Sequence, residues 1–237
     1  MTLSPTARRA LDAYGGEERW RKATTVEAEI SAAGLLFTLK RRPPLRHARI
    51  IMEVAKPVSR ITPIGKSPLV SGVLYSHDVA LEDAQGTPLA RRTGARAYFP
   101  YKRRLLYWDD LDMAYFANYA FWNYLTFPRL LLNDDIVWTE KADGVLSAYF
   151  PEHIPTHSRE QVLFFDNETG LLRQHNYNAD VVTPLATAAN TVIEHARFDG
   201  HDYPSLRRVT PRTRAGVARG FPLLVEITVH SFSLQTI

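Results

Sequence analysis

LLYWDDLDMAYFANYAFWNYLTFPRLLL, residues 105–132, is the stretch that decides the fold. It holds nine aromatic residues between Tyr107 and Phe127, and no charged residue from Met113 to Phe127. A helix that is apolar on nearly every side must be buried on nearly every side, because none of its faces favours water. The stretch therefore predicts a buried helical segment rather than a helix on the protein surface.

The ends of this segment carry helix signals. Asp109 or Asp110 can accept hydrogen bonds from the first free backbone N–H groups, and the carboxylate of Asp112 favours the positive end of the helix dipole. A residue that precedes proline disfavours helical dihedral angles, so Thr126-Phe127-Pro128 is expected to end the helix, and Pro128 can open a second short one. We expect one substantial helical region near residues 109–132.

Most of the remaining sequence is typical of short β-strands. Apolar and polar residues alternate from Thr25 to Ile30 and from His47 to Val54, which indicates strands with one buried face. The alternation continues through Leu35, Phe37 and Leu39, where we also expect strand. Turn signals separate the later runs, which favours an antiparallel sheet, barrel or sandwich whose hollow holds the helix. No linker or repeat divides the chain, so we expect a single domain over residues 1–237.

Composition argues against several classes of protein. The net charge of +4 is small and its basic clusters are scattered, so no nucleic-acid partner is expected. The chain has no cysteine, which excludes disulfides, zinc–thiolate sites and thiol nucleophiles. It also has no nucleophile elbow, phosphate-binding glycine loop or dinucleotide fingerprint, so no cofactor is expected.

Metal binding and membrane insertion are also not expected. Two histidines occur in Glu152-His153-Ile154-Pro155-Thr156-His157, but Pro155 argues against a helix that would make them converge, so this segment is expected to be a polar loop without metal. The charge-free window of residues 113–127 is shorter than the roughly 20 residues that span a bilayer, which argues against an integral membrane segment. The first nine residues lack the apolar run of a signal peptide, so a cytoplasmic location is expected.

The order of elements and the turns resemble a known family. A short helix ending in Tyr14-Gly15-Gly16 precedes a run of strands and a helical insertion. Hairpins follow, whose turns read Asp166-x-x-Thr169-Gly170-Leu171 and Asp199-Gly200-x-x-Tyr203-Pro204. This arrangement resembles the LolA/LolB/LppX superfamily of lipoprotein-carrier-like half-barrels. The resemblance implies a mainly β (α+β) fold in which a curved antiparallel half-barrel sheet wraps a helical plug over an apolar cavity.

Aromatic side chains supply the candidate ligand-binding residues. Tyrosine and tryptophan carry polar tips that a purely structural core rarely needs so often, which favours cavity lining, although plain core packing also explains them. The candidates are Tyr107, Trp108, Tyr115, Phe116, Tyr119, Trp122, Phe127 and Tyr75.

The alternation of side chains between the two faces of each strand indicates three candidates for acid–base catalysis. Glu194 shares a face with Val192, Ala196 and Phe198, and burial in an apolar hollow would raise the pKa of its carboxyl. His175 and Tyr177 lie together on one face of another strand. This interpretation fails if the side of the strand that faces inward has been misjudged. It also fails if Glu194 pairs with a neighbouring arginine such as Arg208.

Three functions remain open from the sequence alone. The first is a carrier or sensor that binds a hydrophobic or amphiphilic small molecule in an apolar cavity covered by residues 105–132. The second is a cofactor-independent lyase, isomerase or cyclase that uses Glu194, His175 and Tyr177. The third is a module that binds a protein partner through its aromatic segment. The sequence does not indicate an oligomeric state.

Overall fold

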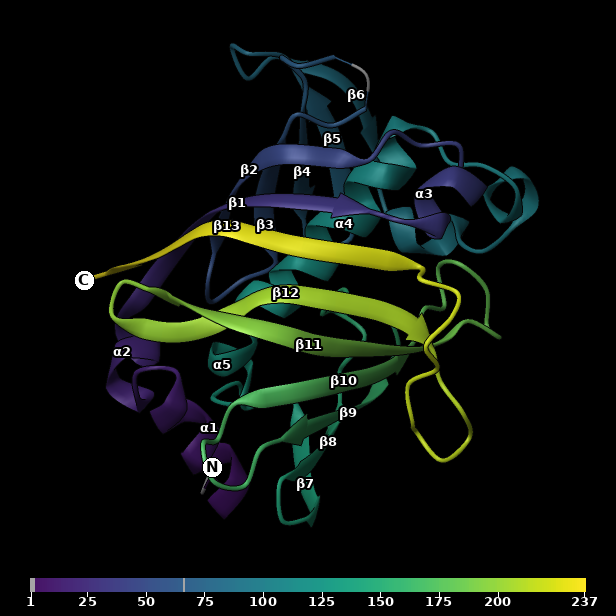
Figure 1. The fold of residues 1–237 in the computed structure, drawn as a ribbon. Coiled ribbons are helices and arrows are strands. Elements are labelled where there is room, and N and C mark those ends of the chain that lie inside the picture. The colour runs from purple at the N-terminus through teal and green to yellow at the C-terminus, as the bar shows by residue number, and fades with distance from the viewer. Residues whose placement is uncertain (1–2, 66) are drawn as a thin grey trace.

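Thirteen antiparallel strands form one curved sheet in the computed structural model, which describes residues 3–65 and 67–237 (Figure 1). The strand order across the sheet is β6-β5-β4-β3-β2-β1-β13-β12-β11-β10-β9-β8-β7. The first half contains β1 (Ala23–Ala33), β2 (Leu45–Glu53), β3 (Val58–Thr62), β4 (Ser71–Tyr75), β5 (Asp78–Glu82) and β6 (Pro88–Arg92). The second half contains β7 (Val137–Ala142), β8 (Val145–Tyr149), β9 (Glu160–Phe165), β10 (Leu172–Asn178), β11 (Thr187–Phe198), β12 (His201–Pro211) and β13 (Val225–Thr236).

All but one of the neighbouring strand pairs are also consecutive in sequence. The exception is β1 with β13, where Ala28 pairs with Phe232 and Ile30 pairs with Val229. The chain thus runs from the middle of the sheet out to β6, continues at the opposite edge with β7, and returns to the middle. The segment between β6 and β7 must therefore cross from one edge to the other, and this segment contains the aromatic stretch.

The helices are short except for the one in this crossing segment. They are α1 (Pro5–Ala13), α2 (Glu17–Lys22), α3 (Leu35–Leu39), α4 (Asp110–Leu125) and α5 (Phe127–Leu130), with 3-10 turns η1 (Ala95–Tyr98) and η2 (Lys102–Leu105). Thirteen of the sixteen residues of α4 are buried, as its apolar sequence predicts. Among the described residues, no helix has the length and apolar character needed to cross a membrane.

The ends of α4 lie where the sequence places them. The carboxylate of Asp109 accepts from the backbone N–H of Asp112 at 2.7 Å, and the Asp112 carboxylate accepts from the backbone N–H of Asp109 at 3.1 Å. This reciprocal pair satisfies two N–H groups that a helix start leaves free. The helix ends at Leu125, and Phe127-Pro128 begins α5. The expected mainly β half-barrel with a helical plug is confirmed.

Polar side chains hold α4 at both ends. At its start, the fully buried Asp112 forms ion pairs with Arg92 at 2.5 Å, Arg103 at 2.8 Å and Arg104 at 2.6 Å. At its end, the Tyr203 hydroxyl donates to the carbonyl of Leu125 at 2.6 Å. Anions favour the amino end of a helix, so the position of the Asp112 carboxylate follows the helix dipole.

Residues 35–39 form the helix α3, so the strand predicted there is wrong. Gly34 has φ 141°, and a Cβ at this position would lie 2.5 Å from the carbonyl oxygen of Leu224. The backbone N–H groups of Leu35 and Leu36 donate to the carbonyls of Leu223 and Leu224, which turns the chain out of β1. Three alternating leucine and phenylalanine residues are too few to distinguish a strand from one helical turn.

Candidate functional site

A cavity of about 260 Å³ lies between α4 and the second half of the sheet. The helix contributes one wall, and β10 to β13 contribute the opposite wall together with α3 and residues 179–186. Most of the lining is apolar: Ala32, Leu36, Phe37, Leu39, Leu45, Met113, Phe116, Ala117, Ala120, Phe121, Ala179, Val182, Leu185, Ala186, Ala188, Val209, Pro211, Leu224, Val225 and Ile227. The space is thus suited to an apolar occupant.

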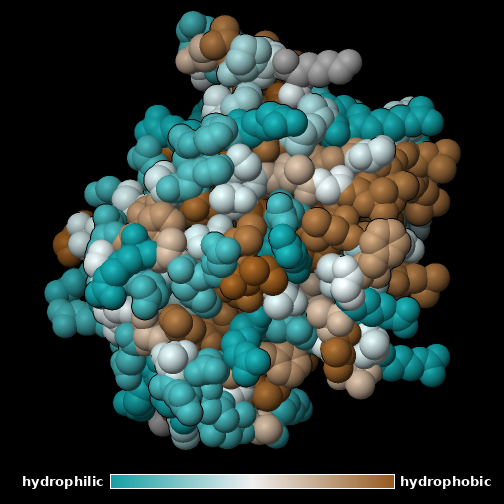
Figure 2. Space-filling model, in the orientation of Figure 1, coloured by the Kyte–Doolittle hydropathy of each residue, from teal (hydrophilic) through white to brown (hydrophobic). Residues whose placement is uncertain are grey.

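The mouth of the cavity is marked by two exposed leucines among these lining residues. Leu39 of α3 is 57% exposed, and Leu185 of the loop between β10 and β11 is 86% exposed. Hydrophobic side chains gather on the surface at the right of the space-filling view, where α3 lies in Figure 1 (Figure 2). An apolar molecule leaving water would meet apolar surface before it enters the cavity.

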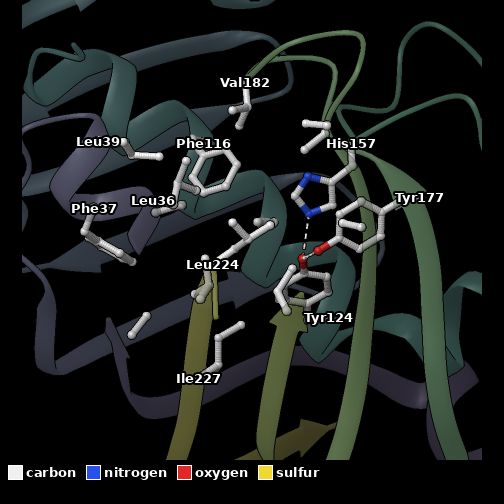
Figure 3. A pocket seen from close by; sticks show the side chains of 18 of the residues that line it. Leu36, Phe37, Leu39, Phe116, Tyr124, His157, Tyr177, Val182, Leu224 and Ile227 are labelled. Carbon is white, nitrogen blue, oxygen red and sulfur yellow. Dashed lines mark hydrogen bonds between the residues drawn. The ribbon is translucent and has the colours of Figure 1, made fainter. Parts of the chain in front are cut away.

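The buried wall of the cavity carries three polar side chains. The Tyr124 hydroxyl lies 2.7 Å from His157 Nε2 and 2.6 Å from the Tyr177 hydroxyl. The rings of His157 and Tyr177 stack with their centroids 4.0 Å apart. Figure 3 shows these side chains together on one wall, across the cavity from Leu36 and Phe37. The cavity is therefore amphipathic, with its polar groups gathered on one buried wall.

These polar groups are uncharged at neutral pH. Burial is the main cause that holds the pKa of His157 well below 6.5, and electrostatic interactions with the neighbouring His175 and Arg96 lower it further. Burial raises the pKa of Tyr124 to about 12 and raises that of Tyr177 well above 10. The wall therefore offers hydrogen bonds without a titrating charge.

His175 lies behind this wall, with its Nε2 2.5 Å from Gln161 Oε1. Burial, assisted by the charge of Arg207, lowers the pKa of His175 from 6.5 to about 3. Below pH 6.5 the unfolded chain binds a proton that the folded protein does not, so acid favours unfolding. The stability linked to this proton is complete above about pH 6.5 and is lost as the pH falls toward 3.

We expect His175→Gln to flatten the acid side of the stability profile. Each neutral buried histidine contributes a slope of about 1.4 kcal/mol per pH unit well below its unfolded pKa. Urea unfolding measured from pH 6 to pH 4 should therefore show a slope smaller by about that amount in the variant than in the wild type. Equal slopes in the two proteins would contradict a neutral, buried His175.

The predicted ligand-binding residues divide between the cavity and the surrounding core. Phe116 lines the cavity, and Trp108 packs against it with ring centroids 4.9 Å apart, beside the cavity rather than in its wall. Tyr107 is 41% exposed near Arg103, and Tyr75, at the end of β4, is 52% exposed. The remaining four are buried outside the cavity wall: Tyr115, Tyr119, Trp122 and Phe127.

The predicted catalytic residues do not meet. His175 and Tyr177 are buried, with ring centroids 5.2 Å apart, but Glu194 is exposed and does not face the hollow as its strand phase predicts. The register between β11 and β12 shifts on both sides of Glu194. Such bulges change which side chains face inward, and His195 follows with its Nε2 3.1 Å from the buried Tyr14 hydroxyl.

Two polar residues of the cavity wall, Tyr124 and His157, were not among the predicted site residues. The segment around His157 is a loop, as expected, but the His157 side chain is only 1% exposed. Arg96 holds the loop in place by donating to the carbonyls of Thr156 at 2.6 Å and His157 at 3.1 Å. These contacts join segments about 60 residues apart. No local pattern around His157 indicates them.

Comparison with known proteins places this architecture among the LolA-like half-barrels. The LolA superfamily protein NE2245 from Nitrosomonas europaea superposes with a TM-score of 0.50 over 100% of this chain and 96% of its own, at 9% sequence identity. A DUF1329 family protein from Desulfovibrio piger gives a TM-score of 0.49 over 97% of this chain and 91% of its own, at 14% identity. No protein-family model and no curated protein matches the sequence. The chain has a LolA-like fold.

Proposed function

We propose that this protein binds a hydrophobic or amphiphilic small molecule in the cavity between α4 and the sheet, as a carrier or sensor. The observation that carries this proposal is the apolar cavity with its exposed leucines at the mouth. Each methylene group moved from water into such a space contributes about 0.8 kcal/mol. The LolA-like fold supports the proposal, because it sets a curved sheet around the buried helix.

The size of the cavity limits the occupant. Its volume of about 260 Å³ lies just below the range of about 300–1,000 Å³ that is typical of ligand pockets. A single alkyl chain or one compact ring system suits this space better than a lipid with several chains.

Catalysis and protein-partner binding each require a side-chain position that the structure does not have. Catalysis in the hollow needed the carboxylate of Glu194, which is exposed. Docking of a protein through the aromatic segment needed its rings on the surface, but Tyr115, Tyr119 and Trp122 are at most 1% exposed. A binding protein agrees best with these positions.

Filling the cavity should weaken binding strongly. Ala120 lies on the cavity face of α4 and is 4% exposed, so Ala120→Phe places a ring inside the space. We expect the affinity for the uncharged fluorescent probe N-phenyl-1-naphthylamine to fall at least tenfold, at a stability cost of about 1–3 kcal/mol. Fluorescence titration measures the affinity, and thermal melting by circular dichroism shows that the variant is folded.

Ala84→Phe provides the matched control. Ala84 is exposed in the turn between β5 and β6, so the same added ring should leave probe binding unchanged. A folded Ala120→Phe protein that binds the probe like the wild type would place the binding site elsewhere.

A further inference from the structure

The polar wall of the cavity, formed by Tyr124, His157 and Tyr177, belongs to a chain of hydrogen bonds. This chain has one more donor hydrogen than it has hydrogen bonds. The Tyr119 hydroxyl lies 3.2 Å from His157 Nδ1, and the chain continues from His157 to Tyr124 and Tyr177. Each tyrosine supplies one O–H, and a neutral imidazole supplies one N–H. Four hydrogens are thus available for three hydrogen bonds, so one donor hydrogen is left over within this chain.

The unused hydrogen must belong to a tyrosine. Both ring nitrogens of His157 are engaged, one as donor and one as acceptor, so its N–H is always used. Tyr119 is fully buried and lies outside the cavity wall, where a donor without an acceptor is strongly disfavoured. Tyr124 and Tyr177 line the cavity, so the free O–H is best placed on one of them and directed toward the cavity.

The side chains behind Tyr124 make this wall electropositive, and one of their buried polar atoms lacks a hydrogen-bond partner among the described residues. The buried Arg207 lies 5.4 Å from the centre of the Tyr124 ring, and its Nη1 has no hydrogen-bond partner in the part of the chain that the structure describes. The side-chain amide of the buried Asn190 lies beside the Tyr124 hydroxyl and interacts with it. Burial raises the pKa of the Tyr124 hydroxyl, and hydrogen bonds with Tyr177 and Asn190 and the charge of Arg207 oppose this effect.

This arrangement selects the polar group of a ligand. A positive environment with a free O–H favours a hydrogen-bond acceptor and disfavours a cation. An ionised carboxylate needs several hydrogen bonds when it leaves water, and this wall supplies one free O–H. Arg207 is separated from the cavity by the Tyr124 ring and does not line it.

We propose that the ligand is a single-chain amphiphile with an uncharged carbonyl group, bound with its head inward so that the carbonyl oxygen accepts the free O–H of Tyr124 or Tyr177. This inference rests on the proposed function, since it requires the cavity to be occupied. The alkyl chain then lies along the apolar lining toward Leu39 and Leu185.

A pair of matched probes tests the head group. 2-Decanone carries the carbonyl, and 2-methyl-1-decene replaces that oxygen with a methylene group of similar shape. Competition with N-phenyl-1-naphthylamine gives the preference of each protein for the ketone over the alkene. The double variant Tyr124→Phe/Tyr177→Phe removes both cavity-facing hydroxyls, and we expect its preference to be about fivefold lower than that of the wild type, the loss of one neutral hydrogen bond.

Infrared spectroscopy gives a second readout. The stretching band of 2-decanone labelled with carbon-13 at the carbonyl should lie at lower wavenumber when bound to the wild type than when bound to the double variant, because a hydrogen bond weakens the C=O bond.

Tyr115→Phe is the matched control. It removes a hydroxyl from the same helix, bonded to His77 Nδ1 at 2.9 Å and outside the cavity wall, so the ketone preference should stay at the wild-type value. An unchanged preference in the folded double variant would overturn the proposal, as would tighter binding of decanoate at pH 8 than of 2-decanone. If the wild type bound no N-phenyl-1-naphthylamine, the proposed function itself would fail, and this inference with it.

Discussion

Replacing Asp112 by alanine is expected to lower the free energy of unfolding by about 3–5 kcal/mol, because removing one partner of a buried ion pair leaves an uncompensated charge. The Asp112 side chain is fully buried, and the side chains of Arg92 and Arg104 are only 13% and 9% exposed. Asp109 remains as a second partner for Arg92 and Arg103, but no other carboxylate pairs with Arg104 in the described part of the chain. The loss also removes one half of the reciprocal hydrogen bonds that start α4.

Chemical denaturation of wild type and variant measures this loss. Glu226→Ala provides the comparison, because Glu226 pairs with Arg208 at 2.8 Å with both side chains more than a third exposed. An exposed pair contributes about 0–1 kcal/mol, so this control should remain near the wild type. A loss below about 1 kcal/mol for Asp112→Ala would mean that the arginines around it are well solvated.

Trp122→Ala should be about equally damaging to stability, yet leave ligand binding intact. Trp122 is 1% exposed, donates from Nε1 to the carbonyl of Glu53 at 2.8 Å, and lies outside the cavity wall. Removing a buried tryptophan from a packed core costs about 3–5 kcal/mol. The affinity of the remaining folded protein for N-phenyl-1-naphthylamine should equal that of the wild type.

Phe116→Ala is the counterpart of this variant on the same helix. Phe116 lines the cavity and is only partly buried, so its removal should weaken probe binding and cost less stability than the loss of Trp122. Denaturation curves and titrations of both proteins separate the two roles. Weaker probe binding in Trp122→Ala than in Phe116→Ala would assign Trp122 to the cavity and contradict its position in the core.

The features that the sequence predicts correctly are those that depend on patterns among neighbouring residues. The helix over residues 110–125 follows from its aromatic composition and its acidic start, and the alternation through Ile50 and Met52 appears as buried positions of β2. Turn and proline signals correctly place the end of the helix before Phe127-Pro128. These signals depend only on neighbouring residues, so they are readable in one chain.

The features that the sequence does not predict depend on contacts between distant segments. The inward or outward direction of Glu194 is set by two register shifts against β12, which strand alternation alone does not reveal. The burial of His157 depends on Arg96, which lies about 60 residues away along the chain. The helical turn at residues 35–39 depends on the close approach of Gly34 to Leu224. The polar wall of the cavity is built from such contacts, which is why only Tyr177 of its three members was a candidate.

The pairing of β1 with β13 has a consequence for biosynthesis. Strands β1 to β6 can pair with one another as soon as they leave the ribosome, because each contacts the strand before it. One side of β1 then keeps unpaired backbone groups until residues 225–236 have been made, since β13 is its partner on that side. Exposed strand edges promote pairing between chains. A nascent chain that lacks β13 would therefore carry an open edge at what becomes the centre of the finished sheet, and the last strand of this sheet to be synthesised closes it.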